Sequence, residues 1–264
     1  MTEPLLDVTG VTKVYRTSRW PAPPLRTVAV DDVSLQVQAG ESVGIVGESG
    51  SGKSTLAGTI CGLVKPDSGT IRLDGQDLYP RGKFDREAWR SLQLVFQDPY
   101  TSLNPGMTLE DTVAEPVRNW RGASDREARK VAREMLDLVG LGDAFATRRP
   151  GNLSGGQRQR ASIARALAVS PKMIVLDESV SALDVSVQAQ ILELLLELRR
   201  ERNLTYLLIS HDIGVIRLFC DRVVVMQHGK IVEACTSDEL TLDGVQEPYT
   251  RQLLSAVPVL RAAS

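Results

Sequence analysis

A chain of 264 residues with 42% hydrophobic and 24% charged residues has the composition of a folded globular protein and is long enough to bury a full core. Lysine and arginine number 31 and aspartate and glutamate 33, so the formal charge of −2 supplies no overall field for holding nucleic acid or anionic lipid. These values exclude disordered and low-complexity chains and predict one large domain or two subdomains.

The three cysteines, Cys61, Cys220 and Cys235, are odd in number and form no CxxC pair, which favours a reducing compartment over a disulfide framework. With only two histidines, the chain is poorly supplied for a multi-ligand zinc site. The segment Met1–Gly10 does not resemble a signal peptide, and no stretch approaches the roughly 18 apolar residues of a spanning helix. We expect a cytosolic chain whose membrane role, if any, comes through a partner.

The first third of the sequence reads as strands followed by the start of an α/β unit. Apolar residues alternate in the strand manner between residues 6 and 37, whereas the proline-rich stretch 19–24 predicts a loop because each proline removes a ladder donor. The apolar run Ser42–Val46, a glycine cluster and a helical segment over 54–63 follow. Residues 71–75 predict a strand that enters an Asp-Gly turn.

The clearest helix is predicted over 124–139. Ser124 and Glu127 have capping-box spacing, and Gly140 stands where a C-terminal cap glycine belongs. The predicted core-facing stripe consists of Val131, Met135 and Leu138, with Ala128 and Ala132 beside it. Further along, the apolar runs 173–176 and 206–209 suit strands buried on both faces, and the helical pattern 187–199 between them completes a βαβ unit.

A glycine-rich loop follows the predicted strand Ser42–Val46. Its residues are Gly47, Glu48, Ser49, Gly50, Ser51, Gly52, Lys53 and Ser54, the pattern of a phosphate-binding loop. Glycines let backbone N–H groups turn inward around phosphate oxygens, and the following helix adds its positive N-terminal end. Lys53 then supplies a charge to the outer phosphates, and Ser54 a hydroxyl to Mg²⁺.

Carboxylates and a histidine follow two of the buried runs. Asp177 and Glu178 come after the run 173–176, and His211 comes after the run 206–209. Ligands of open α/β sheets bind at the carboxyl ends of strands, where Asp177 can hold Mg²⁺ through water and Glu178 can polarise an attacking water. His211 at the same edge can reach a γ-phosphate. We expect the ends of three strands to converge: the strand that leads to the Lys53 loop, the strand before Asp177 and the strand before His211.

A second anion site is predicted at the start of another helix. Ser154 and Gln157 have capping-box spacing, and Gly155 and Gly156 between them leave amide N–H groups bare. The Lys53 loop already saturates one triphosphate. The second site is therefore expected to serve a nucleotide held by another copy.

These motifs together resemble the ATP-binding subunits of ABC transporters. The Lys53 loop, Leu153–Gln157, Asp177-Glu178, Ser181–Asp184 and His211 occur in that family's order, and Gln97 and Tyr15 match its glutamine loop and its adenine-stacking aromatic. The resemblance implies an α/β fold: a RecA-like P-loop ATPase core with an N-terminal antiparallel β subdomain and an inserted α-helical subdomain. It implies a single ABC ATPase domain over 1–264, with core and β subdomain in 1–96 and 160–264 and the helical subdomain in 97–159.

The family's site residues carry over by position. ATP would lie between the Lys53 loop, including Thr55, of one subunit and the Ser154–Gln157 segment of the other, with Asp184 linking the two sites. Glu178 would be the catalytic base, aided by His211, Gln97 and Lys53, and Ser54, Gln97 and Asp177 would serve Mg²⁺. Ser179 departs from the family, which usually has proline there, so the backbone after Glu178 is less constrained.

A narrower likeness, in 96–105, 181–190 and 249–258, is to importers of dipeptides, oligopeptides, nickel and metal chelates. It implies an ATPase on the inner face of the membrane, paired with a sister ATPase or a second copy of itself. Its partners would be two permeases and, indirectly, an extracytoplasmic solute-binding protein, with no nucleic acid. The iron–sulfur centre of some members is not carried over, because no cysteine follows Cys235. An accessory ATPase of a soluble phosphonate-breakdown complex is the alternative.

The surface that meets the permeases is expected to follow Gln97. Tyr100 and Leu103 either line a groove for a short permease helix or pack inside the helical subdomain.

Overall fold

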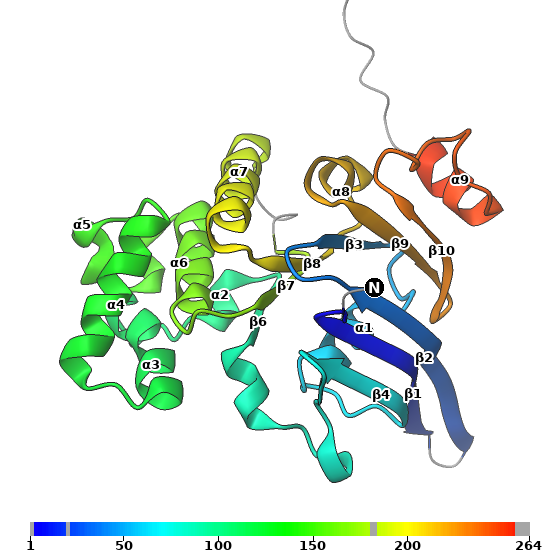
Figure 1. Ribbon diagram of the computed structural model, residues 1–264, viewed down its shortest axis with the longest axis horizontal. Helices are drawn as coiled ribbons and strands as arrows, with labels where there is room; N and C mark the ends of the chain where they lie inside the picture. The colour runs from blue at the N-terminus through cyan, green and yellow to red at the C-terminus, as the bar shows by residue number, and fades with distance from the viewer. Residues whose placement is uncertain (1–2, 20–21, 180–183, 257–264) are drawn as a thin grey trace, which may run out of the picture. The chain divides into compact units, whose positions relative to one another are not determined.

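The computed structural model describes residues 3–19, 22–179 and 184–256. The chain divides into two compact units, one made of residues 1–84 and 207–264 and the other of residues 85–206. Figure 1 shows the ribbon of both units. Each unit is described by itself.

In the first unit a four-stranded sheet has the order β2-β1-β4-β5. Its strands are β1 (Leu6–Arg19), β2 (Ala22–Val37), β4 (Ser68–Leu73) and β5 (Gln76–Asp77). The neighbouring strands pair in the antiparallel direction, which confirms the predicted antiparallel β portion. The turn between β4 and β5 uses Asp74 and Gly75, both at positive φ, as the Asp-Gly pair predicts.

The loop predicted over 19–24 is wrong for the residues described there. β1 continues to Arg19 and β2 begins at Ala22, so Pro23 and Pro24 lie within a strand. The reason is that β2 is an edge strand of the sheet, where a missing N–H donor can face away from the neighbouring strand.

The same unit also holds the strand that leads to the glycine-rich loop. β3 (Ser42–Val46) is buried throughout, as the apolar run predicts, and lies parallel to β9 (Arg222–Gln227), which pairs antiparallel with β10 (Lys230–Thr236). The helices are α1 (Lys53–Ile60), α8 (Ile213–Phe219) and α9 (Pro248–Ser255), with a 3₁₀ turn at Pro80–Gly82. α1 ends before the predicted Leu63, because Gly62 has a φ of +77° against the ring of Phe84.

The second unit combines a parallel strand pair with a group of helices. β6 (Leu92–Val95) pairs parallel with β7 (Met173–Asp177), and a 3₁₀ turn at Arg86–Arg90 precedes β6. The helices are α2 (Pro99–Ser102), α3 (Leu109–Arg121), α4 (Asp125–Leu138), α5 (Asp143–Ala146), α6 (Gly155–Leu167) and α7 (Val185–Arg202), with a 3₁₀ turn at Pro150–Asn152. β8 (Thr205–Ile209) begins in this unit and ends in the other. The predicted strand, helix and strand of the βαβ unit are therefore present.

The predicted helix over 124–139 is confirmed as α4, with a complete capping box between Ser124 and Glu127. Its buried face differs from the expected stripe. Val131 and Leu138 are only half-buried, whereas Leu136 is fully buried. The face is shifted because α4 packs through its two alanines, which let the helix approach α3 and α6 closely.

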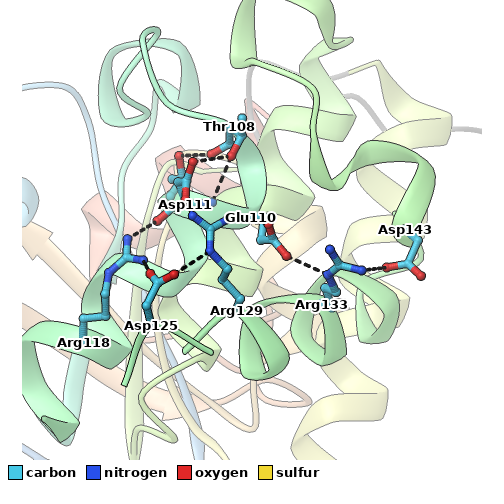
Figure 2. A network of polar contacts seen from close by, with 9 residues as sticks. Thr108, Glu110, Asp111, Arg118, Asp125, Arg129, Arg133 and Asp143 are labelled. Atoms are coloured by element: carbon cyan, nitrogen blue, oxygen red, sulfur yellow. Dashed lines mark hydrogen bonds and ion pairs between the residues drawn. The ribbon is translucent and has the colours of Figure 1, made fainter. Parts of the chain in front are cut away.

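One carboxylate anchors α3 to α4. The side chain of Glu110 is only 7% exposed, and its two oxygens accept hydrogen bonds from Arg129 Nη1 at 2.7 Å and Arg133 Nε at 2.6 Å. Arg129 also bridges Asp111 and Asp125, which extends the network shown in Figure 2. Burial alone would raise the pKa of Glu110, but the hydrogen bonds and charges of the two arginines outweigh it and hold that pKa below its usual value.

Glu110→Gln is expected to lower the free energy of unfolding at pH 7 by about 1–3 kcal/mol, because the amide replaces one of the two acceptor oxygens with an NH₂ donor and removes the negative charge. Urea unfolding measures this loss. A group with a lowered pKa stabilises the fold above its unfolded pKa, and this contribution disappears as the pH falls through the folded value, so parent and variant should converge in acid. Glu134→Gln is the control, because its 3.9 Å pair with Lys130 is exposed, and it should change stability by about 0.5 kcal/mol or less. Equal losses of stability in the two variants would contradict the role of Glu110 as the anchor between α3 and α4.

Candidate nucleotide-binding site

The loop between β3 and α1 contains two glycines, Gly47 and Gly52, that no other residue could replace without a clash. A Cβ at Gly47 would lie 2.2 Å from the carbonyl oxygen of Met226, and one at Gly52 would lie 2.1 Å from that of Ala29. Gly50, at a φ of +81°, faces open space. The loop therefore passes close to its neighbours on one side and leaves backbone exposed on the other, as a phosphate cradle requires.

Lys53, the first residue of α1, is held inside this loop. It is only 5% exposed, and its Nζ donates hydrogen bonds of 2.7 Å to the carbonyl oxygens of both Gly47 and Glu48. The Oγ of Ser51 lies 3.4 Å away. A buried ammonium needs such partners, and its position at the start of a helix adds to the positive potential of the loop. The donors available here, the Lys53 ammonium and the backbone N–H groups of the loop, fit the phosphates of a nucleotide.

In the second unit, Gln97 and Glu178 are brought together. Gln97 Nε2 donates a hydrogen bond of 2.9 Å to Glu178 Oε2, although the two residues are 81 positions apart in the sequence. Asp177 is the last residue of β7, and Glu178 follows at a φ of +44°, a left-handed conformation that is strained for a residue with a side chain. Backbone strain of this kind gathers at functional sites, so the pair marks a candidate site for activating water.

Ser179, where the family usually has proline, follows directly. It is 2% exposed, and among the described residues, which leave out the adjoining 180–183, its Oγ has no hydrogen-bond partner. The expectation of a less constrained backbone after Glu178 stays a prediction.

The end of β8 lies beside β3 in the first unit. The Ser210 N–H donates to the carbonyl oxygen of Ile45 at 3.3 Å, and Asp212 caps α8 through the N–H groups of Gly214 and Val215. His211 between them is exposed, next to the strand that feeds the Lys53 loop. Two of the three strand ends expected to converge therefore share this unit, and the convergence of the third, at Asp177 in the other unit, stays a prediction.

The second predicted anion site has the expected helix start. α6 begins after Ser154 with a complete capping box to Gln157. Gly155 and Gly156 form its first turn, and a Cβ at Gly156 would lie 2.4 Å from Val187 Cγ1, so glycine is needed there for close packing against α7. Asp184 precedes α7 and is exposed. The neighbouring predicted residues 181–183 lie outside the described part of the chain.

Tyr15 on β1 is 41% exposed, and Lys13 Nζ lies 5.7 Å from the centre of its ring. An exposed aromatic ring of this kind can stack on a base.

The predicted site residues are divided between the two units. Tyr15, His211 and the residues of the 47–55 loop lie in the first unit. Gln97, Asp177, Glu178, Asp184 and the Ser154–Gln157 segment lie in the second unit.

The sequence profile of the ABC transporter family matches residues 30–181, more than half of the chain and all of the loop just described. The chain belongs to the ABC transporter family. It is accordingly an ATP-binding protein and an ATPase of that family. Its antiparallel sheet and its mixed parallel strands are those of an ABC nucleotide-binding cassette.

Relatives of this ABC ATPase extend over nearly the whole chain. The probable peptide ABC transporter ATP-binding protein y4tS of Sinorhizobium fredii is 46% identical, over 98% of this chain and 74% of the relative. The oligopeptide transport ATP-binding protein OppF of Bacillus subtilis is 43% identical, over 98% of this chain and 84% of the relative. Among solved structures, a dimeric post-hydrolysis state of the ATP-binding cassette MJ0796 with ADP and Pi is 34% identical with a TM-score of 0.77, covering 88% of this chain and 98% of that one.

The structure decides between the two alternatives left open for Leu103 and adds one contact that the sequence of this ABC ATPase does not predict. Leu103 is 2% exposed, so it packs in the core, as one of the alternatives holds, whereas Tyr100 is 60% exposed. The phenol oxygen of Tyr249 accepts a hydrogen bond of 2.9 Å from the N–H of Glu48 in the loop. The segment 249–258 carries part of the family likeness, but nothing in its residue types alone indicates a contact with a loop 201 positions away.

Lys53→Ala is expected to weaken ATP binding by about 10- to 150-fold, because it removes a charge-assisted contact of about 1.5–3 kcal/mol. Fluorescence titration with a nucleotide analogue measures the change. Lys130→Ala, at a side chain that is 79% exposed, should bind like the parent. Unchanged affinity in the Lys53 variant would refute the loop's assignment.

Proposed function

We propose that this ATPase drives an importer for peptides, through hydrolysis of ATP at sites shared between two ATPase subunits. The observation that carries the proposal is the 2.9 Å hydrogen bond between Gln97 and Glu178, because it sets a carboxylate against the glutamine that links the nucleotide to the helical region. The relatives named as peptide and oligopeptide transport proteins support the choice of cargo.

Phosphoryl transfer to water depends on positioning and charge stabilisation. Lys53 neutralises charge on the outer phosphates, assisted by the backbone N–H groups of the 47–55 loop, and Tyr15 stacks on adenine. Glu178, which the hydrogen bond from Gln97 orients, accepts the proton of the attacking water. Gln97 also helps to position that water. His211 contacts the γ-phosphate. Bound Mg²⁺ would supply further charge neutralisation.

The Mg²⁺ ligands that we propose are the hydroxyl of Ser54 and the oxygens of Gln97 and Asp177. These are the hard oxygen donors that this ion prefers, and it usually keeps several waters as further ligands. A cage of three or more carboxylates, histidines or cysteines is therefore not required, and the described residues contain none.

The partners proposed are a sister ATPase or a second copy, whose Ser154–Gln157 segment and Asp184 would complete each site. Dimeric structures of the cassette MJ0796 support this arrangement. Two permeases and, indirectly, a solute-binding protein would carry the peptide. Within the part of the chain that the structure describes, no helix is long and apolar enough to cross a bilayer. By likeness to the peptide-transport relatives, the place that we propose for this ATPase is the inner face of the membrane, where the permeases hold it and Tyr100 is an exposed contact.

Glu178→Gln is expected to retain ATP affinity within about twofold and to lose turnover by two orders of magnitude or more, because the binding contacts remain and the proton acceptor is lost. Steady-state phosphate release and nucleotide titration measure the two quantities, and size-exclusion chromatography with ATP should show an accumulated dimer. Glu193→Gln, at an exposed position of α7, is the matched control. Turnover near the parent rate would remove Glu178 from the mechanism.

Uptake of a labelled tripeptide tests the importer itself. Cells that express the ATPase with the permease and binding-protein genes beside it should accumulate peptide, and cells with the Glu178→Gln variant should not. Uptake of nickel or a metal chelate instead would change the cargo, and co-purification with a soluble phosphonate-cleaving complex would overturn the transport role.

A further inference from the structure

The C-terminal helix α9 contacts the phosphate-binding loop through one phenol. Tyr249, in the first turn of α9, is 8% exposed, and its oxygen accepts a hydrogen bond of 2.9 Å from the N–H of Glu48. Both residues belong to the first unit. The mechanism proposed above assigns no role to this contact.

The Glu48 N–H belongs to the peptide group whose carbonyl is that of Gly47. That carbonyl oxygen accepts the 2.7 Å hydrogen bond from Lys53 Nζ. A single peptide group is thus held at both ends, by the phenol of Tyr249 at its N–H and by the ammonium of Lys53 at its oxygen. Because the two bonds polarise the same group in the same direction, each strengthens the other.

The chain on either side leaves this peptide group little freedom of position. A Cβ at Gly47 would lie 2.2 Å from the carbonyl oxygen of Met226, so strand β9 packs directly against it. On the other side, the carbonyl oxygen of Glu48 accepts from Lys53 Nζ at 2.7 Å and from the Ser51 N–H at 3.1 Å. The Gly47–Glu48 peptide plane can still rotate, and the hydrogen bond from the Glu48 N–H to the Tyr249 oxygen opposes this rotation.

α9 is anchored independently of Tyr249. Glu233 on β10 accepts hydrogen bonds from the N–H groups of Gln246 at 2.7 Å and Glu247 at 3.4 Å, where the helix begins. Arg251 donates to the carbonyl oxygen of Val245 through Nε at 3.1 Å and Nη2 at 3.0 Å. Removal of the phenol oxygen alone should therefore leave the helix in place.

We infer that Tyr249 is a positioning residue for Lys53: it fixes the peptide group that holds the ammonium, so that α9 sets the affinity of the loop for ATP. This inference rests on the proposed function in one respect, the binding of phosphates by Lys53. The phenol remains neutral in the assay range, because burial raises the pKa of Tyr249 above its ordinary value. The effect of Tyr249 on ATP affinity should consequently not depend on pH between about 6 and 9, because this range lies at least one unit below the ordinary tyrosine pKa of about 10.

Tyr249→Phe in the full chain is the test, because it removes the oxygen and keeps the buried ring. The expected result is a rise of about 3- to 10-fold in the Kd and KM for ATP, the range of one neutral hydrogen bond, with kcat within about twofold. The melting temperature is recorded alongside. A residue that only supports the fold would lower that temperature and leave the KM unchanged.

Tyr79→Phe is the matched control. It also removes a phenol hydroxyl from this unit, at a half-buried residue, and that hydroxyl donates to the carbonyl oxygens of Thr59 in the last turn of α1 and Val64 just after the helix. Its Kd and KM for ATP should equal those of the parent.

Lys53→Ala, measured in parallel, separates the two hypotheses. Weakened binding in Lys53→Ala with an unchanged KM in Tyr249→Phe, or an equal KM rise in Tyr249→Phe and Tyr79→Phe, would overturn the role of Tyr249 alone. Undiminished binding in Lys53→Ala would overturn the proposed role of the loop.

Discussion

A buried positive charge organises the phosphate-binding loop of this ATPase. An ammonium at 5% exposure is costly unless it is hydrogen-bonded, and Lys53 has the carbonyl oxygens of Gly47 and Glu48 within 2.7 Å. The loop can bring those oxygens inward only because glycine at 47 and 52 allows contacts with Met226 and Ala29 that any Cβ would prevent. The side chain, the loop path and the neighbouring strands thus depend on one another. Phosphate oxygens would be further acceptors for the same ammonium, which has three N–H donors.

The site in the second unit relies on a different physical device. The backbone at Glu178 is held in a left-handed conformation, and the carboxylate is oriented by an amide from a segment 81 residues earlier. Parallel pairing of β6 with β7 places the residues that follow each strand at the same edge, which is why Gln97 and Glu178 meet. The packing of these two paired strands, of which β7 is buried from Met173 to Leu176, thereby compensates the strain at one backbone position.

Much of this arrangement could be predicted from the sequence, because local chemistry decides it. The capping boxes at Ser124 and Ser154 and the buried strand Ser42–Val46 depend on residues near one another in the chain, and each is present. What could not be predicted has tertiary causes. Pro23 lies in a strand because β2 is an edge, and the choice between groove and core for Leu103 depends on packing that its own neighbours in sequence do not reveal. The contact between Tyr249 and Glu48 depends on a fold that brings together residues 201 positions apart.

The two edges of the antiparallel sheet have a consequence for association. One edge is β2, which contains two adjacent prolines, and the other is β5, which is only two residues long. Prolines and short strands are the features by which natural sheets avoid adding a foreign strand, since they offer few groups for a continuing ladder. This sheet is therefore a poor template for aggregation, even when a high concentration of the protein is produced in a cell.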